Sequence, residues 1–260
     1  MKHVMENDLK GFLAQYQNSE VDFFRFPGNY GDSLIWHGTM KLLSALNIIP
    51  VSVEETSQVK NKVLFIDGGG NFVDYYDDVR KFISKKHQAY TDIVIFPHTI
   101  FGQKQVDVLS RLKGNTTIFC RETETAEFVR VHAKACKIFL WHDCAFYNAF
   151  DMPAGGTGTL NAFRSDCESV MESLPSDNID ISYDGYATKP LIEFLNCLAR
   201  FEQINTDRLH VAIASALLGK SVNLYPNSYF KNEAVFNYSL RQFPDVQFHN
   251  RKPYQHDSKF

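Results

Sequence analysis

Histidine and arginine side chains suited to anion binding and proton transfer stand at several points of the chain. His98 and Arg121 each follow an apolar segment of the strand type, and His210 stands near the start of an apolar helical segment. An arginine can hold a carboxylate or phosphate through two parallel hydrogen bonds, and a histidine can exchange a proton near neutral pH. These residues therefore indicate chemistry on a small anionic molecule.

Two glycine-containing loops could present backbone N–H groups to the same anion. The segment 27–33 (PGNYGDS) joins a predicted strand to a predicted helix, and the segment 67–72 (DGGGNF) follows the next predicted strand as a turn. A loop that leads from a strand into a helix can bind phosphate or carboxylate. Neither loop has the G-x-G-x-x-G or P-loop spacing of nucleotide-binding proteins. The loop residues that we predict to contact substrate are Asn29, Asp32, Gly69, Gly70 and Asn71.

The start of a predicted helix near residue 209 is the third candidate site. Thr206 or Asp207 is the expected N-cap, which places Arg208, Leu209 and His210 in or beside the first turn. Unpaired backbone N–H groups and the positive end of the helix dipole favour an anion there. We therefore predict substrate contacts from these three residues, against the alternative of an ordinary capped helix with a half-buried histidine.

Ordinary structural roles compete with the ligand-binding interpretation at other positions. Arg164 follows a predicted strand at 160–163 and is a further substrate-binding candidate, but it could simply pair with Asp166 across a turn. Arg121 could likewise pair only with Glu122 or Glu124. His98 could be no more than a polar residue that ends its strand.

Strand and helix patterns alternate along the chain, which predicts an α/β fold with parallel, doubly wound sheets. The expected strands are 21–26, 62–66, 92–96, 116–120, 137–141, 160–163 and a buried strand at 221–225. The expected helices are 7–17, 34–47, 75–87, 105–113, 123–132, 168–174, 190–201, 209–218 and 232–242. A Gly-rich linker at 150–159 divides the chain into predicted domains at 1–150 and 151–260, with a cleft between them lined by strand ends.

Composition narrows the class of protein. The 260 residues are 44% hydrophobic and 22% charged, with a formal net charge of -3, so nothing in the overall charge favours nucleic-acid binding. The five cysteines form no C-x-x-C pair, which argues against zinc and against a disulfide framework, and we predict no metal site. No apolar run reaches the roughly 20 residues of a membrane span, and the N-terminus lacks a signal-peptide pattern. We expect a cytoplasmic protein.

Six short motifs occur in an order that resembles the polysaccharide pyruvyl transferase family. They are Gly28-Asn29-Tyr30-Gly31-Asp32, Gly68-Gly69-Gly70-Asn71, Pro97-His98-Thr99, Cys120-Arg121-Glu122, Phe163-Arg164-Ser165-Asp166 and Thr206-Asp207-Arg208-Leu209-His210. The resemblance implies two Rossmann-like domains in a GT-B-like pair. It also implies transfer of the enolpyruvyl unit of phosphoenolpyruvate, with no cofactor, onto two hydroxyls of a polysaccharide or lipid-linked saccharide. A lipid-linked acceptor would bring the protein to the inner face of the membrane.

The same resemblance places His98, Arg121 and His210 at donor-site positions, with the Leu209 backbone beside His210. For ketal formation, Arg121 would hold the carboxylate or phosphate, one histidine would protonate the methylene carbon, and the other would neutralise the phosphate. Two alternatives are a GT-B glycosyltransferase that uses a nucleotide-sugar and a non-catalytic carbohydrate-binding protein. A fold alone does not separate these activities.

Overall fold

The computed structural model describes residues 9–26, 28–151, 155–182 and 190–250. The chain forms two compact units: unit 1 contains residues 1–26 and 35–147, and unit 2 contains residues 27–34 and 148–260. The predicted domains at 1–150 and 151–260 would leave residues 27–34 with the first half. In the structure this segment packs with the second, where the ring of Tyr30 stacks on Phe194 at a centroid distance of 5.2 Å.

Unit 1 is built on a seven-stranded parallel sheet with the order β2-β1-β3-β5-β6-β7, and β4 pairs with the far half of β5. Its strands are β1 (Glu20–Phe24), β2 (Ile49–Ser52), β3 (Val63–Ile66), β4 (Gly69–Val73), β5 (Asp92–Phe101), β6 (Thr116–Cys120) and β7 (Lys137–Leu140). The order reverses direction after β2. Because crossovers between parallel strands are right-handed, this reversal places helices on both faces of the sheet.

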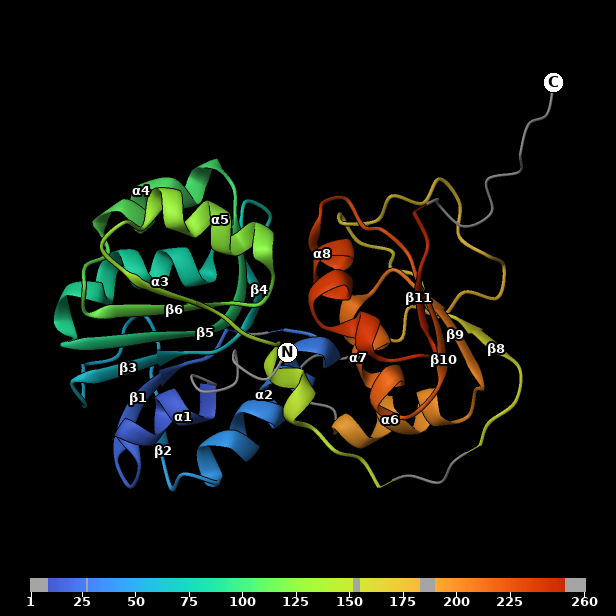
Figure 1. Ribbon diagram of the computed structural model, residues 1–260, viewed down its shortest axis with the longest axis horizontal. Helices are drawn as coiled ribbons and strands as arrows, with labels where there is room; N and C mark the ends of the chain where they lie inside the picture. The colour runs from blue at the N-terminus through green and yellow to red at the C-terminus, as the bar shows by residue number, and fades with distance from the viewer. Residues whose placement is uncertain (1–8, 27, 152–154, 183–189, 251–260) are drawn as a thin grey trace. The chain divides into compact units, whose positions relative to one another are not determined.

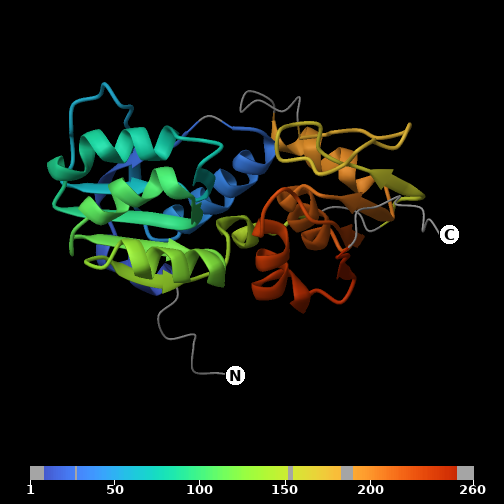
Figure 2. The same cartoon turned by 90° about the horizontal axis from the view of Figure 1, so that it is seen from above.

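The helices of unit 1 form the two layers that this topology requires. They are α1 (Leu9–Leu13), α2 (Tyr30–Ser44, which begins in unit 2), α3 (Asp78–Lys86), α4 (Gln103–Arg111) and α5 (Thr123–His132). Figure 1 shows α1 and α2 on one face of the sheet and α3, α4 and α5 on the other. Figure 2 looks onto the second layer, where these three helices lie side by side. The doubly wound sheet predicted for this half is confirmed.

Three strands of unit 1 differ from the sequence prediction, and one of them, β2, was not predicted at all. The predicted turn at 67–72 is wrong, because Gly69–Val73 forms β4 and pairs with β5 from His98 to Phe101. β5 itself is ten residues long rather than five, since the apolar pattern continues beyond Pro97. The first half of β5 pairs with β3 and the second half with β4, so one long strand spans both neighbours.

Unit 2 is built on a four-stranded parallel sheet with the order β11-β10-β9-β8. Its strands are β8 (Thr159–Asn161), β9 (Gln203–Thr206), β10 (Ser221–Leu224) and β11 (Val246–Phe248), and its helices are α6 (Leu191–Ala199), α7 (Leu209–Leu217) and α8 (Lys231–Tyr238). Each strand adds to the same edge as its predecessor. Right-handed crossovers therefore place all three helices on one face, as Figure 1 shows.

The helix predicted at 168–174 is absent, and these residues form turns and bends. The physical reason lies at Glu168, whose buried carboxylate accepts hydrogen bonds from Arg164, Asn227 and Lys231 instead of facing solvent from a helix. Part of the predicted linker, residues 152–154, lies outside the described residues, as do residues 7–8 of the predicted first helix. Among the described residues, no helix is long and apolar enough to cross a membrane.

Candidate functional site

His98 lies in the middle of β5, fully buried, and pairs in register with Gly69 of β4 and Cys120 of β6. Its Nδ1 is 3.2 Å from the backbone carbonyl oxygen of Asp67. A carbonyl oxygen only accepts hydrogen bonds, so Nδ1 carries the proton and Nε2 is left as an acceptor. Within the described part of the chain, Nε2 has no hydrogen-bond partner. A buried unsatisfied acceptor of this kind is suited to a donor group supplied by a ligand.

Burial lowers the pKa of His98 to about 3, and the neighbouring positive charge of Arg121 acts in the same direction. The imidazole is therefore neutral at physiological pH. In this state His98 can accept a hydrogen bond at Nε2, but its low pKa disfavours uptake of a proton.

Arg121 directly follows β6 and is 1% exposed. Its Nε donates to the hydroxyl oxygen of Thr99 at 2.8 Å, and its Nη1 donates to the carboxylate of Asp143 at 2.8 Å. Gly70 is also adjacent, because a Cβ there would lie 3.3 Å from Nη2. The backbone of β4 thus approaches the guanidinium group closely, at the glycine-rich segment that the sequence singled out.

Glu122 follows Arg121 and is also fully buried, with a carboxylate oxygen 3.8 Å from Nε of Arg121. It accepts hydrogen bonds from Thr99 and Thr125. Burial nevertheless raises the pKa of Glu122 to about 7, although the charge of Arg121 opposes this. Asp143, at the shorter distance, is therefore the main counter-ion of Arg121.

The structure shows why two positions of the segment 67–72 are occupied by glycine. A Cβ on Gly68 would lie 2.7 Å from the carbonyl oxygen of Pro97, which is too close for any side chain. Gly69 has a φ of 139°, a conformation that favours glycine. Asn71 lies beyond them and exchanges hydrogen bonds with Asp78, its Nδ2 donating at 3.0 Å and its Oδ1 accepting from the Asp78 N–H at 3.2 Å. Asn71 thereby fixes the start of α3.

In unit 2, α7 begins at Leu209. The N-cap is Arg208, with extended backbone, and not Thr206 or Asp207. The Thr206 hydroxyl accepts the N–H of Arg208 at 3.0 Å, and an Asp207 carboxylate oxygen accepts the N–H of Arg164 at 2.8 Å. The two polar residues thus hold the turn before the helix. His210 is the second residue of α7 and is half-buried, while Leu209 is buried.

The side chain of His210 packs against Gly31 at the start of α2. A Cβ on Gly31 would lie 2.6 Å from Nδ1 of His210 and 2.9 Å from its Cβ and Cγ. No side chain fits between them, so the imidazole lies directly against the backbone of α2. Sequence reasoning noted the glycine-containing loop but did not pair it with this histidine, because the two residues are far apart in the chain.

Asn29 and Asp32 form a reciprocal cap at the start of α2. The side-chain oxygen of Asn29 accepts the N–H of Gly31 at 2.7 Å, and the carboxylate of Asp32 accepts the N–H of Asn29 at 2.9 Å. The bond from the Asn29 N–H to Asp32 is that of a capping box, while the Asn29 side chain accepts the N–H of the second rather than the third helical residue. Ser182 adds a contact to Asn29 at 3.4 Å. Both predicted substrate-binding residues therefore already satisfy helix N–H groups in the structure.

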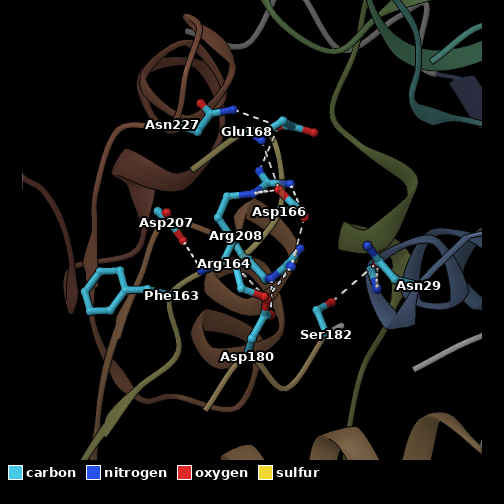
Figure 3. A network of polar contacts seen from close by, with 12 residues as sticks. Asn29, Phe163, Arg164, Asp166, Glu168, Asp180, Ser182, Asp207, Arg208 and Asn227 are labelled. Carbon is cyan, nitrogen blue, oxygen red and sulfur yellow. Dashed lines mark hydrogen bonds and ion pairs between the residues drawn. The ribbon is translucent and has the colours of Figure 1, made fainter. Parts of the chain in front are cut away.

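Arg164 and Arg208 lie in a buried network of ion pairs, which Figure 3 shows from close by. Arg164 pairs with Asp166 at 2.7 Å and with Glu168 at 2.7 Å. Arg208 pairs with Asp166 at 3.0 Å and with Asp180 at 2.5 Å. Asp166 joins the two arginines. Both guanidinium groups thus face carboxylates of the chain itself, as the structural alternative for Arg164 and Asp166 expected.

The functional candidates therefore fall into two clusters. His98, Arg121 and Gly70 come together in unit 1, and His210 lies against Gly31 in unit 2. Sequence reasoning missed the roles of Thr99, Asp143 and Gly31; Asp143 follows β7 at a strand end, which was the available signal. No group of three or more metal-ligating side chains occurs in the described ranges.

Comparisons with known proteins agree with this arrangement of motifs. The family model described as "Polysaccharide pyruvyl transferase" matches residues 29–229. A Bacillus subtilis (strain 168) protein named "Putative pyruvyl transferase EpsO" is 25% identical in an alignment that spans 320 residues with its gaps and covers 99% of this chain and 97% of that protein.

A solved structure shows the same fold. The crystal structure of a functionally uncharacterized protein from Klebsiella pneumoniae subsp. pneumoniae NTUH-K2044 matches with a TM-score of 0.80 and 28% identity. The match covers 93% of this chain and 97% of that one.

Proposed function

Because the chain belongs to the polysaccharide pyruvyl transferase family, we propose that it transfers the enolpyruvyl unit of phosphoenolpyruvate to a pair of saccharide hydroxyls. The observation that carries this proposal is the family match over residues 29–229, which includes His98, Arg121 and His210. The acceptor would be a polysaccharide or a lipid-linked saccharide. A GT-B-like pairing of two Rossmann-like units around a cleft, and association with the inner face of a membrane when the acceptor carries a lipid, belong to the same proposal.

The reaction balances without a cofactor. One saccharide hydroxyl adds to the central carbon of phosphoenolpyruvate while a proton is delivered to the methylene carbon, which becomes the methyl group. The second hydroxyl then displaces phosphate from the same carbon and completes the ketal. Of the two protons that the hydroxyls lose, one ends on the methyl group and the other on phosphate.

The two histidines take different roles in this proposal. A neutral His98 with its proton on Nδ1 has no proton to give at Nε2, and its low pKa makes it a poor base, so we assign it the role of a hydrogen-bond acceptor that orients an attacking hydroxyl. His210 then remains as the proton donor to the methylene carbon. Arg121 would hold the carboxylate or phosphate of the donor, and its charge also keeps His98 unprotonated.

Thermal stabilisation by the donor is the first test. Phosphoenolpyruvate present at 100 times its dissociation constant should add about 2.7 kcal/mol to the unfolding free energy. We expect a rise in melting temperature with phosphoenolpyruvate and none with nucleotide-sugars. The reverse result would favour a glycosyltransferase and contradict the proposal.

Substitution of the two histidines is the second test. We expect His98→Ala and His210→Ala to abolish pyruvyl transfer to a saccharide acceptor, measured as pyruvyl-modified product by mass spectrometry. His132→Ala changes a half-buried histidine of α5 and is the matched control. If both site variants transferred pyruvate at the rate of the control, the assignment of these residues would be wrong.

A further inference from the structure

One face of the unit 2 sheet consists entirely of neutral polar side chains. The strand registers arrange these residues in two rows that cross the sheet: Thr159, Gln203 and Ser221 form the first, and Asn161, Asn205, Asn223 and Gln247 form the second. Their neighbours on the opposite face, Leu160, Ile204, Val222 and Val246, are buried. The predicted buried strand at 221–225 is therefore wrong for its outer residues, since Ser221 is exposed and Asn223 half-exposed.

Topology explains why none of the helices in the described part of unit 2 lies over this face. All crossovers of unit 2 advance in one direction, so α6, α7 and α8 cover the apolar face together (Figure 1). Parallel sheets are normally covered on both faces, and their strands are then apolar throughout. Here the strands alternate between polar and apolar residues, so the sequence itself specifies a sheet with one face free of helices.

The three asparagines form a continuous row of side-chain hydrogen bonds. Asn223 donates to Asn205 at 2.8 Å, and Asn205 donates to Asn161 at 2.9 Å. The row ends at Asp177, which accepts from Asn161 at 3.0 Å, and begins at His249, whose Nε2 is 2.8 Å from the Asn223 oxygen. These bonds hold the amides in fixed orientations along neighbouring strands, which lie about 4.8 Å apart.

The chemistry of the rows restricts what they can bind. Nucleic acids and other polyanions are held by lysine and arginine, and the two rows contain neither. Protein interfaces have cores rich in aromatic and apolar residues, which the rows also lack. Amides and hydroxyls both donate and accept hydrogen bonds, as sugar hydroxyls do. A neutral, hydroxyl-rich ligand is therefore the best complement to this face.

An aromatic surface adjoins the asparagine row. The ring of Tyr225, the residue after β10, stacks on His249 at a centroid distance of 4.9 Å and an angle of 19°. Both rings are half-exposed. An aromatic ring beside fixed amides offers apolar contact to a sugar ring together with hydrogen bonds to its hydroxyls.

We propose that this polar face, defined by the two rows, binds a neutral saccharide chain and so holds a polymeric acceptor on unit 2. The identification of that chain as the acceptor rests on the proposed function, whereas the binding itself does not. The face lies at the strand ends that precede Arg208 and Tyr225, and it shares no residue with His98, Arg121 or His210.

Affinity electrophoresis of the full chain tests the proposal. Native gels contain a neutral galactan, glucan or mannan, and a parallel gel contains the polyanion polyglutamate. We expect at least one neutral polymer, and not polyglutamate, to retard the protein. The double variant N205A/N223A should bind that polymer about tenfold more weakly, which corresponds to about 1.4 kcal/mol. Gln247→Glu, at an exposed position, adds a charge to the face without removing the asparagine row and should also weaken binding.

The controls separate this inference from folding and from catalysis. Gln103→Ala removes an exposed amide from unit 1 and should leave retardation unchanged, and urea unfolding shows whether each variant is folded. Thermal stabilisation by phosphoenolpyruvate is measured on the same samples, because its absence counts against the transfer reaction and not against the face. The inference is overturned if no neutral polymer retards the protein, or if Gln247→Glu and N205A/N223A are retarded equally with wild type.

Discussion

Replacing Gly31 by alanine places one methyl group against the imidazole of His210. The new Cβ would lie 2.6 Å from Nδ1 and 2.9 Å from Cγ and Cβ of His210. Carbon and nitrogen atoms do not approach this closely without bonding, so either the ring or the start of α2 must move. The histidine is a half-buried side chain, whereas the start of α2 is backbone, so we expect the imidazole to move.

Two opposing effects set the change in stability. Overpacking of a closely packed contact typically costs about 1–3 kcal/mol. Alanine in a helix is favoured over glycine by roughly 0.5–1 kcal/mol. The clash wins at these distances, and we expect Gly31→Ala to lower the unfolding free energy by about 0.5–2 kcal/mol. Transfer should fall by on the order of a hundredfold, because a displacement of about 1 Å at a reacting group has that effect.

A double-mutant cycle with His210→Ala assigns the cost to this contact. His210→Ala removes two of the three closest atoms and leaves only Cβ, so Gly31→Ala should cost at least about 1 kcal/mol less in that background. Urea unfolding measures all four proteins. Gly114→Ala is the matched control, because a Cβ there meets only the carbonyl oxygen of Ala135, at an ordinary 3.6 Å.

The reasoning is refuted if Gly31→Ala and Gly114→Ala change stability and transfer equally. A coupling energy of zero between Gly31→Ala and His210→Ala would refute it as well, since the clash would then involve some group other than the imidazole.

Three further predictions concern the buried polar groups and a cap. Asp143→Ala should cost about 3–5 kcal/mol in urea unfolding because it leaves the buried charge of Arg121 without its counter-ion, whereas Asp107→Ala, in an exposed pair, should cost less than about 1 kcal/mol. The pKa of Glu122 is raised from 4.5 to about 7, so the folded protein holds its proton more tightly than the unfolded chain does. The stabilisation of the folded state by this proton is full below pH 4.5 and is lost as the pH rises through 7. Wild type should therefore lose stability relative to Glu122→Gln over that window, with a slope of at most about 1.4 kcal/mol per pH unit, and equal slopes would contradict this. Asn29→Ala should cost about 1 kcal/mol through the lost cap; full stability with abolished transfer would instead indicate a substrate contact.

Local sequence patterns predicted the bounds of an element where the element has a single hydrophobic period and its neighbours in the chain do not continue that period. The strand at 116–120 and the helix at 123–132 were predicted at their observed bounds, because five apolar or β-branched residues are followed directly by a helical pattern. The prediction failed at 67–72, where three glycines indicated a turn. The pairing partner of Gly69–Val73 is the far half of β5, and a contact between distant segments leaves no local pattern.

The site could be predicted by residue type but not by contact. Arg121 and His210 stand at a strand end and a helix start, as the sequence predicts, whereas His98 was expected just beyond a strand and lies inside β5. The partners that decide their chemistry come from elsewhere in the chain: Asp143 neutralises Arg121, Asp67 fixes the proton of His98, and Gly31 makes room for His210. Asn29 and Asp32 were predicted as substrate contacts, with Asp32 or Ser33 capping a helix that begins at Leu34. The helix begins four residues earlier, at Tyr30, and Asn29 and Asp32 together form its cap.

The asparagine row of unit 2 has a consequence for how its amides can turn. Each amide donates toward Asp177, and a carboxylate can only accept, so Asp177 sets the direction of the first amide and through it of every other. No single amide can reverse without placing two donors or two acceptors face to face. The three amides therefore share one orientation and can reverse only together. The sheet presents the same order of N–H and C=O groups to every ligand.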